Sequence, residues 1–264
     1  MSATRLSTSF RLTGLALVRN RVALTLFVML PVLFYTLILI TTTDAPVAFT
    51  LPAVSATTMI DVSRREEALV FMGLAAVGFV SAFLGLYLMS RQAEVNRRLL
   101  LCGYRAWELV LSRLLVLGCA IGAVSVFSGL LLQICFAPRH LLLTIVGFFL
   151  VGTVYGCYGL LAGSIFRREL EGVLSIVLLA NIDVAWLQNP IFYTESKNKF
   201  VIRCLPAHFP SQVSMIGAFS DYSIRWAVLA SLAYGAVLLS LAVLVFWWRM
   251  RIVTPREANS PRRV

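Results

Sequence analysis

Residues 90–113 read SRQAEVNRRLLLCGYRAWELVLSR, and they form the most polar stretch of an otherwise very apolar chain. Its charged side chains are mostly basic: Arg91, Arg97, Arg98, Arg105 and Arg113 against Glu94 and Glu108. Apolar runs long enough to cross a lipid bilayer lie on both sides of this stretch. The pattern predicts a polar loop between two membrane-spanning helices.

The composition of the whole chain agrees with this interpretation. The 264 residues are 59% hydrophobic and 13% charged, with a mean hydropathy of +0.87. A soluble globular domain carries about 25% charged residues. The composition therefore indicates a polytopic membrane protein without a sizeable soluble domain. The net charge of +11 fits loops held in the cytoplasm by arginine, so no nucleic-acid partner is expected.

Six apolar runs predict an all-α fold with six transmembrane helices. The expected spans are about 22–40, 68–89, 109–136, 141–166, 172–188 and 224–248, so that residues 22–248 form one transmembrane domain. Residues 1–21 predict an amphipathic helix in the membrane interface, with an unstructured basic leader as the alternative. Residues 41–67 are expected as a loop, 189–223 as a long outer segment and 249–264 as a basic tail.

The distribution of charge predicts the orientation in the membrane. Six spans place both termini on one side, and the whole net charge of +11 falls on that side. By the positive-inside rule, both termini are expected in the cytoplasm. The expected location is the plasma membrane of a bacterium, with the chain as a multi-pass protein.

The fourth predicted span carries a regular row of glycines. Gly152, Gly156, Gly159 and Gly163 are spaced four, three and four residues apart, which places them on one helix face. Small residues let helices approach closely within a membrane. We therefore expect this face to pack against neighbouring helices.

The residue types that membrane enzymes use are missing from the predicted spans. The two histidines, His140 and His208, fall in predicted outer loops, and the cysteines show no paired spacing, so neither a metal site nor a disulfide framework is expected. The pair Glu66 and Glu67 is interpreted as solvated loop charge. The chain has no GxxxxGK[ST] phosphate loop, so any ATP must be bound by a partner.

One acidic residue does lie within a predicted span. Asp183, with Asn181 two residues earlier, falls in the outer part of the fifth span. Ionisable residues in spans usually face the bundle interior or water. Asp183 could line a substrate pathway near its outer gate, or it could be an interfacial residue solvated from the loop near Pro190. Both interpretations stay open.

The stretch at 90–113 predicts two short helices joined by a turn at Cys102–Gly103. It resembles the cytoplasmic loop between the second and third spans of ABC-2-type transporter permeases. The matching residues are Glu94, Arg97, Arg98, Leu99, Leu100, Gly103, Trp107, Glu108 and Leu109. The plan of nearly the whole chain is also similar to that family. Val95, Asn96 and Leu99 depart from the usual acidic–Arg–x–x–Gly–Thr run of that family. The exact alignment of this stretch with the docking residues of the family's loop therefore stays open.

The resemblance implies the permease subunit of an ATP-driven exporter, which pairs with a second permease copy or a paralogue. A separate ATP-binding cassette ATPase would hold ATP and Mg²⁺, so this chain would be no enzyme and would bind no cofactor itself. The residues implied to contact the ATPase are Arg91, Glu94, Arg97, Arg98, Gly103, Tyr104, Trp107 and Glu108. The alternative for this loop is that it contacts only anionic membrane lipid.

The resemblance also implies a transport path for an amphipathic small molecule, a lipid or a glycan. The residues implied to line this path are Phe83, Tyr87, Asn181 and Asp183. The outer segment would be partly re-entrant, with Phe200, Val201, Ile202, Phe209 and Met215 partly buried. Two other functions stay open: a membrane anchor or assembly protein without transport, and a membrane-embedded enzyme.

Overall fold

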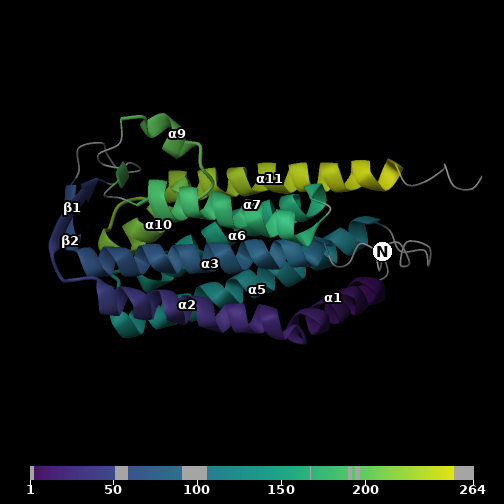
Figure 1. Cartoon of the computed structure of the whole chain (residues 1–264), viewed down its shortest axis with the longest axis horizontal. Helices are drawn as coiled ribbons and strands as arrows, with labels where there is room; N and C mark the ends of the chain where they lie inside the picture. The colour runs from purple at the N-terminus through teal and green to yellow at the C-terminus, as the bar shows by residue number, and fades with distance from the viewer. Residues whose placement is uncertain are drawn as a thin grey trace, which may run out of the picture.

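Helix α3 (Arg64–Ser90) runs through the middle of a bundle of long helices (Figure 1). The computed structural model describes residues 3–50, 59–90, 106–166, 168–189, 192–193 and 197–252. The other long helices are α2 (Arg21–Thr41), α5 (Ala106–Cys135), α6 (Leu141–Ile165) and α11 (Arg225–Ile252). Helix α1 (Ala3–Val18) and the last turns of α11 lie at one end of the bundle, which we call the terminal end. The strands lie at the opposite end, the hairpin end (Figure 1).

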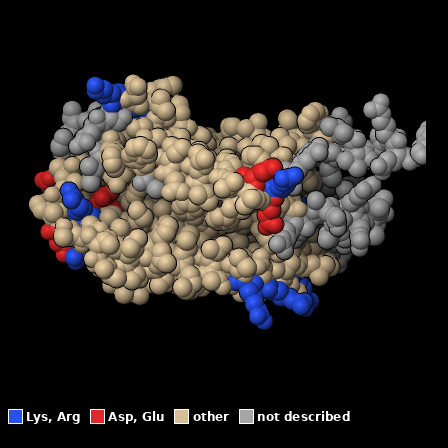
Figure 2. Space-filling view, in the orientation of Figure 1, with Lys and Arg blue, Asp and Glu red and all other residues tan. Residues whose placement is uncertain are grey.

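Within the described residues, five helices are long and apolar enough to cross a membrane: α2, α3, α6, residues Val110–Cys135 of α5 and residues Arg225–Trp248 of α11. In α3, 83% of the most apolar window is buried, but only 17% in α2 and in α11. The outward surface of those two helices is apolar and includes Val22, Ile40 and Leu244. Figure 2 shows a broad surface without charge along the bundle. Water-soluble proteins rarely expose so much contiguous apolar surface, so the chain is a helical membrane protein.

The fifth predicted span has a composite form. Helix α7 (Glu169–Ala180) has 12 residues and continues directly into η1 (Asn181–Leu187), a π-helix of seven residues. The α-helical part alone is shorter than the roughly 20 residues that a span needs. Length and composition therefore identify five candidate spans in the described chain, and the sixth depends on how the composite helix lies.

Two strands within the segment between the first two long helices pair as a hairpin, so the expectation of a loop over residues 41–67 was wrong for residues 46–50 and 59–67. Strand β1 (Pro46–Thr50) pairs antiparallel with β2 (Met59–Ser63). An isolated two-stranded hairpin is marginal in water. This one is supported by Phe49, which is fully buried and lies edge-to-face with Phe219 of α10 (His208–Phe219) at 6.3 Å between ring centroids.

The interpretation of Glu67 as solvated loop charge was also wrong. Helix α3 begins at Arg64, so Glu66 and Glu67 both lie in its first turn. Glu66 is half-buried, whereas Glu67 is only 1% exposed. The hairpin and the helix packing exclude water there, which the local sequence does not reveal.

The backbones of α3 and α6 lie in direct contact. A methyl group at Gly159 would overlap the carbonyl oxygen of Ala82, and one at Gly85 would overlap the carbonyl oxygen of Gly156. Only glycine permits so close an approach at these positions. The contact provides the van der Waals packing that holds helices together in lipid, where apolar burial gives no driving force.

The other glycines of the row lie at the same helix contacts. A methyl group at Gly163 would come within 2.8 Å of Met89 Cβ on α3. At Gly152 it would come within 2.6 Å of Ile121 Cγ2 on α5. The glycine row of α6 therefore faces the groove between α3 and α5.

Helix α1 contacts α5 through a face of small polar residues and exposes apolar residues on another face. Ser9 is buried, and its Oγ lies 2.8 Å from Oγ of Ser112 on α5. Thr13 is buried one turn further along, whereas Leu12 and Leu15 are exposed. A helix with an exposed apolar side beside a membrane bundle suits the interface between lipid and water.

The α3–α6 contact gives a prediction of stability with a matched control. Gly159→Ala should destabilise the fold by about 1–3 kcal/mol, because the added methyl group forces the backbones apart. Gly118→Ala on α5 should be neutral or slightly stabilising, because no atom lies within 4 Å of the added group and alanine favours helix by about 1 kcal/mol. Thermal unfolding in detergent measures both. Equal midpoints for Gly159→Ala and wild type would contradict the contact.

Candidate functional site

Asp183 lies at the centre of a buried polar cluster near the hairpin end. Its side chain has no exposed surface. Oδ2 accepts a hydrogen bond from the Tyr155 hydroxyl of α6 at 2.7 Å and from the backbone N–H of Ala207 at 2.9 Å. The interpretation of Asp183 as an interfacial residue solvated from the loop was therefore wrong. The carboxylate instead joins η1, α6 and the start of α10.

The π-helical geometry of η1 accompanies this arrangement. The backbone N–H of Gln188 donates to the carbonyl oxygen of Asp183 at 3.0 Å, five residues back. Such wide turns are rare in proteins, and those that are found frequently lie at functional sites. Here the wide turn coincides with the buried carboxylate, and the negative charge lies beside the amino end of α10, where the helix dipole favours an anion.

Gln188 extends the cluster to the outer segment. Its Nε2 donates to the carbonyl oxygen of Ile202 at 2.9 Å, and its Oε1 lies 3.1 Å from Nδ1 of His208. With Gln188 Oε1 as acceptor, Nδ1 of His208 is the donor. The His208 ring also stacks on Tyr193 at 5.6 Å between centroids, and Arg203 donates to the Tyr193 hydroxyl at 3.1 Å. These contacts hold the outer segment over η1.

His208 is the titratable member of this outer layer. It was expected in an outer loop, but it begins α10 and is only 3% exposed. Burial, with a smaller effect of the Arg203 charge, lowers the pKa of His208 from 6.5 to about 4. His208 is therefore neutral at pH 7 and donates one hydrogen bond to Gln188.

The side chains of the other residues expected along a transport path do not join the Asp183 cluster. Asn181 is exposed, and its Nδ2 donates to the carbonyl oxygen of Val177 at 2.8 Å. Phe83 and Tyr87 are half-buried on α3 and pack against the core. Leu86, beside Tyr87, contacts Gly172. From Gly172 the α-helix continues for about 12 Å to Ala180 before η1 and Asp183 follow. The described conformation does not bring the four together.

Most residues expected to contact an ATPase lie outside the described residues. These are Arg91, Glu94, Arg97, Arg98, Gly103 and Tyr104. The backbone of Trp107 and Glu108 belongs to the first turn of α5, but their side chains are likewise outside the description.

The part of α5 that follows this loop is described and is joined to two other helices. Ser112 contacts Ser9 of α1, as given above. The next residue, Arg113, is buried, and its Nη1 lies 3.6 Å from the sulfur of Met89 on α3. The start of α5 is thus connected both to α1 and to the end of α3.

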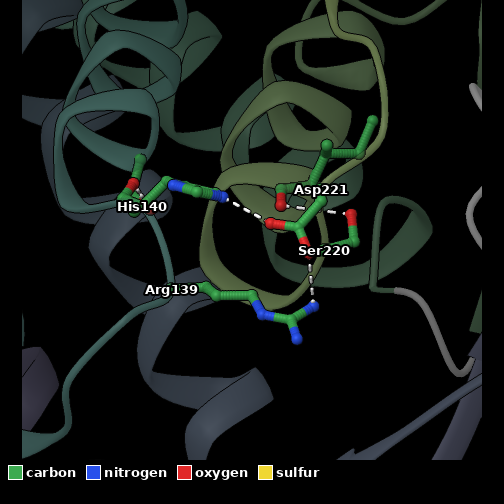
Figure 3. A network of polar contacts seen from close by, with 6 residues as sticks. Arg139, His140, Ser220 and Asp221 are labelled. Carbon is green, nitrogen blue, oxygen red and sulfur yellow. Dashed lines mark hydrogen bonds and ion pairs between the residues drawn. The ribbon is translucent and has the colours of Figure 1, made fainter.

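A second polar network closes the hairpin end (Figure 3). Asp221 accepts from Arg139 at 3.0 Å and lies 2.6 Å from Nε2 of His140. The backbone N–H groups of Arg139 and His140 donate to the carbonyl oxygens of Ala218 and Gly217, each at 2.9 Å. The hydrogen bond with His140 is the main reason why the pKa of Asp221 lies below its ordinary value. This network joins the start of α6 to the end of α10.

Several residues of these networks were not predicted. The sequence pattern singled out Asp183, but not Tyr155, Gln188 or His208 as its neighbours. The local pattern gives no clear signal for Gln188 and His208, because the segment between them mixes apolar residues with Glu195, Lys197, Lys199 and Arg203. Among the described residues, no group of three or more His, Cys, Asp or Glu side chains could hold a metal ion.

Comparison with known proteins adds no relative. The sequence matches no protein-family model and no curated protein sequence. The class of the chain, a helical membrane protein, thus follows from its own helices and their apolar surface.

The buried His208 predicts a dependence of stability on pH. The folded state holds its pKa near 4 while the unfolded chain has a value near 6.5, so the unfolded chain binds more protons between these values. Stability should therefore fall as pH drops from 6.5 to 4, by at most about 3 kcal/mol.

The variant His208→Asn keeps a donor for Gln188 but cannot take up a proton, so its unfolding midpoint should fall less over the same pH interval. Parallel pH profiles of the midpoint for wild type and His208→Asn would contradict this assignment.

Proposed function

We propose that this chain is the permease subunit of an ATP-driven exporter of the ABC-2 type, located in a bacterial plasma membrane. It would form a path with a second permease copy or a paralogue. A separate ATP-binding cassette ATPase would bind ATP and Mg²⁺ and supply the energy. The transported molecule would be an amphipathic small molecule, a lipid or a glycan.

The proposal includes six spans with both termini in the cytoplasm. The composite helix α7–η1 runs from Glu169 to Leu187 without interruption. At the α-helical rise these residues would cover at most about 28 Å, and the smaller rise of the π-helical part makes the composite helix somewhat shorter than the roughly 30 Å of the hydrocarbon core. With it as a sixth span, Arg19 and Arg21, at the junction of α1 and α2, fall on the cytoplasmic side, as the positive-inside rule requires.

The observation that carries the proposal is the connection of three helices at the terminal end. Ser112 and Arg113, just after the 90–113 stretch enters α5, contact Ser9 of α1 and Met89 of α3. A protein that bound this stretch and α1 would therefore act on the central helix as well. An ATPase that drives transport from outside the membrane requires such a connection between its binding surface and the central helix.

The hairpin end supplies the element that would move. The outer segment is held by a small number of polar bonds to Asp183 and Gln188. Tyr155, which donates to Asp183, lies on α6, and α6 packs on α3 through glycine. A shift of α3 and α6 would thus strain the bonds that close the outer segment. To move the population decisively, ATPase binding must favour the open form by about 5 kcal/mol.

The outer segment fits the proposed exit only in part. Ile202 and Met215 are buried, but Phe200 and Val201 are exposed, so their expected partial burial was wrong for the described chain. An anchor or assembly protein is the alternative function. It is favoured by the complete burial of Asp183, which leaves this side chain out of reach of a transported molecule. The experiments below separate the two.

Association with an ATPase tests the export function directly. An ATP-binding cassette ATPase should co-purify with the wild-type chain, identified by mass spectrometry. Glu94→Arg and Trp107→Ala should reduce the recovered ATPase at least about tenfold, because the first reverses a charge in the 90–113 stretch and the second removes an aromatic anchor from it. Export from cells should fall in parallel.

Asp61→Arg provides the matched control, because Asp61 is an exposed acid on β2 at the hairpin end. It should leave both ATPase recovery and export unchanged. Absence of any ATPase from the wild-type preparation, together with unchanged export in Glu94→Arg, would favour the anchor function.

The proposed topology can be tested with native cysteines. Cys204 is exposed beside α9 (Lys199–Arg203) at the hairpin end, so a membrane-impermeant maleimide should label it in intact cells. Cys204→Ser should remove that labelling. Cys102, in the 90–113 stretch, should react only after the membrane is permeabilised. Labelling of Cys102 in intact cells would reverse the proposed orientation.

A further inference from the structure

An apolar groove opens between α1, α2, α3 and α5 near the terminal end, with a volume of about 270 Å³. Leu17 of α1, Phe27 of α2 and Leu84 of α3 line it, and Cys119 of α5 lies in its wall. At Gly14 of α1, an added methyl group would meet no atom within 4 Å. The groove is thus unfilled by the chain's own side chains and large enough for part of an extended hydrocarbon chain.

The mouth of the groove is fixed by the corner between α1 and α2. Val18, at the end of α1, and Ala23, in the first turn of α2, both line the groove. Only residues 19–22 separate them, and they include Arg19 and Arg21. Asn20 caps α2 by accepting from the backbone N–H groups of Val22 and Ala23 at 3.1 and 3.4 Å. The cap fixes the backbone of this corner, so that Arg19 and Arg21 directly adjoin residues that line the groove.

The charge of this corner has one sign. Arg11, Arg19 and Arg21 are exposed, and basic side chains gather at the α1–α2 corner in Figure 2. The first acidic residue of the chain is Asp44, beyond the far end of α2. The corner therefore presents positive charge beside an apolar groove, with no acidic side chain of α1 or α2 to neutralise it.

We infer that this groove binds an anionic phospholipid. One acyl chain occupies the groove, and the phosphate group lies at Arg19 and Arg21. The exposed Leu12 and Leu15 of α1 set this corner at the boundary between headgroups and acyl chains. Basic residues at that depth attract anionic lipid. The site is independent of the export function, because it requires only that the helices lie in a membrane.

The groove contains its own reporter, because the Cys119 thiol is exposed in its wall. The full chain in neutral detergent is mixed with phosphatidylglycerol or with phosphatidylcholine, and alkylation of Cys119 by a maleimide is followed by mass spectrometry. Phosphatidylglycerol should slow alkylation of Cys119 several-fold at concentrations where phosphatidylcholine does not. Cys204, exposed at the hairpin end, is the internal reference and should react at the same rate throughout.

The variant Arg19→Gln/Arg21→Gln should weaken the protection by phosphatidylglycerol at least about tenfold, since each basic residue contributes a factor of about five. The matched control Arg64→Gln/Lys197→Gln removes two exposed basic side chains at the hairpin end and should keep full protection. Unfolding midpoints without lipid show whether each variant is folded.

A second variant tests the acyl-chain part of the site. Gly14→Phe places a side chain in the open space and should slow alkylation of Cys119 without any lipid, while abolishing the effect of phosphatidylglycerol. Equal protection by the two lipids would overturn the inference, as would protection that survives Arg19→Gln/Arg21→Gln. Protection that depends on protein concentration rather than on lipid would identify a second copy of the chain as the occupant and would also overturn it.

Discussion

The structure depends on the backbone contact between α3 and α6. At Gly159 and Gly85 the two helices approach until carbonyl oxygens occupy the space of a side chain. In lipid, apolar side chains gain nothing by leaving the solvent, so contact area and its dispersion energy must hold the bundle. Because α3 is the most buried of the candidate spans, the other long helices are positioned around this pair.

Polar contacts join several elements at each end of the bundle. At the terminal end, Ser112 and Arg113 connect α5 to α1 and α3. At the hairpin end, Asp183 and Gln188 hold the outer segment. Between these clusters the helices pack through small and apolar side chains, and hydrogen bonds of Tyr158 with Ser175 and of Tyr35 with Ser128 also join neighbouring helices. Under the proposed function, a movement of the helices would have to break or preserve these bonds.

Much of the fold could be predicted from the sequence, but less of the site. Apolar runs located the long helices to within a few residues, because the hydrocarbon core fixes how many residues a span needs. The hairpin at 46–63 was missed, since its stability comes from the contact of Phe49 with Phe219, far apart in sequence. Glu67 was expected as solvated loop charge and His208 in an outer loop, yet both are buried by segments that the local pattern cannot show.

The sequence by itself determined that the chain is a helical membrane protein, because hydropathy is a local property and the bilayer acts on each segment separately. It also identified Asp183 as exceptional, because a carboxylate in an apolar run is costly wherever the run lies. Only the tertiary structure decided which groups satisfy that carboxylate. Tyr155 and Ala207 lie 28 and 24 residues from Asp183, and the packing of helices, which no local pattern encodes, brings them within hydrogen-bond distance.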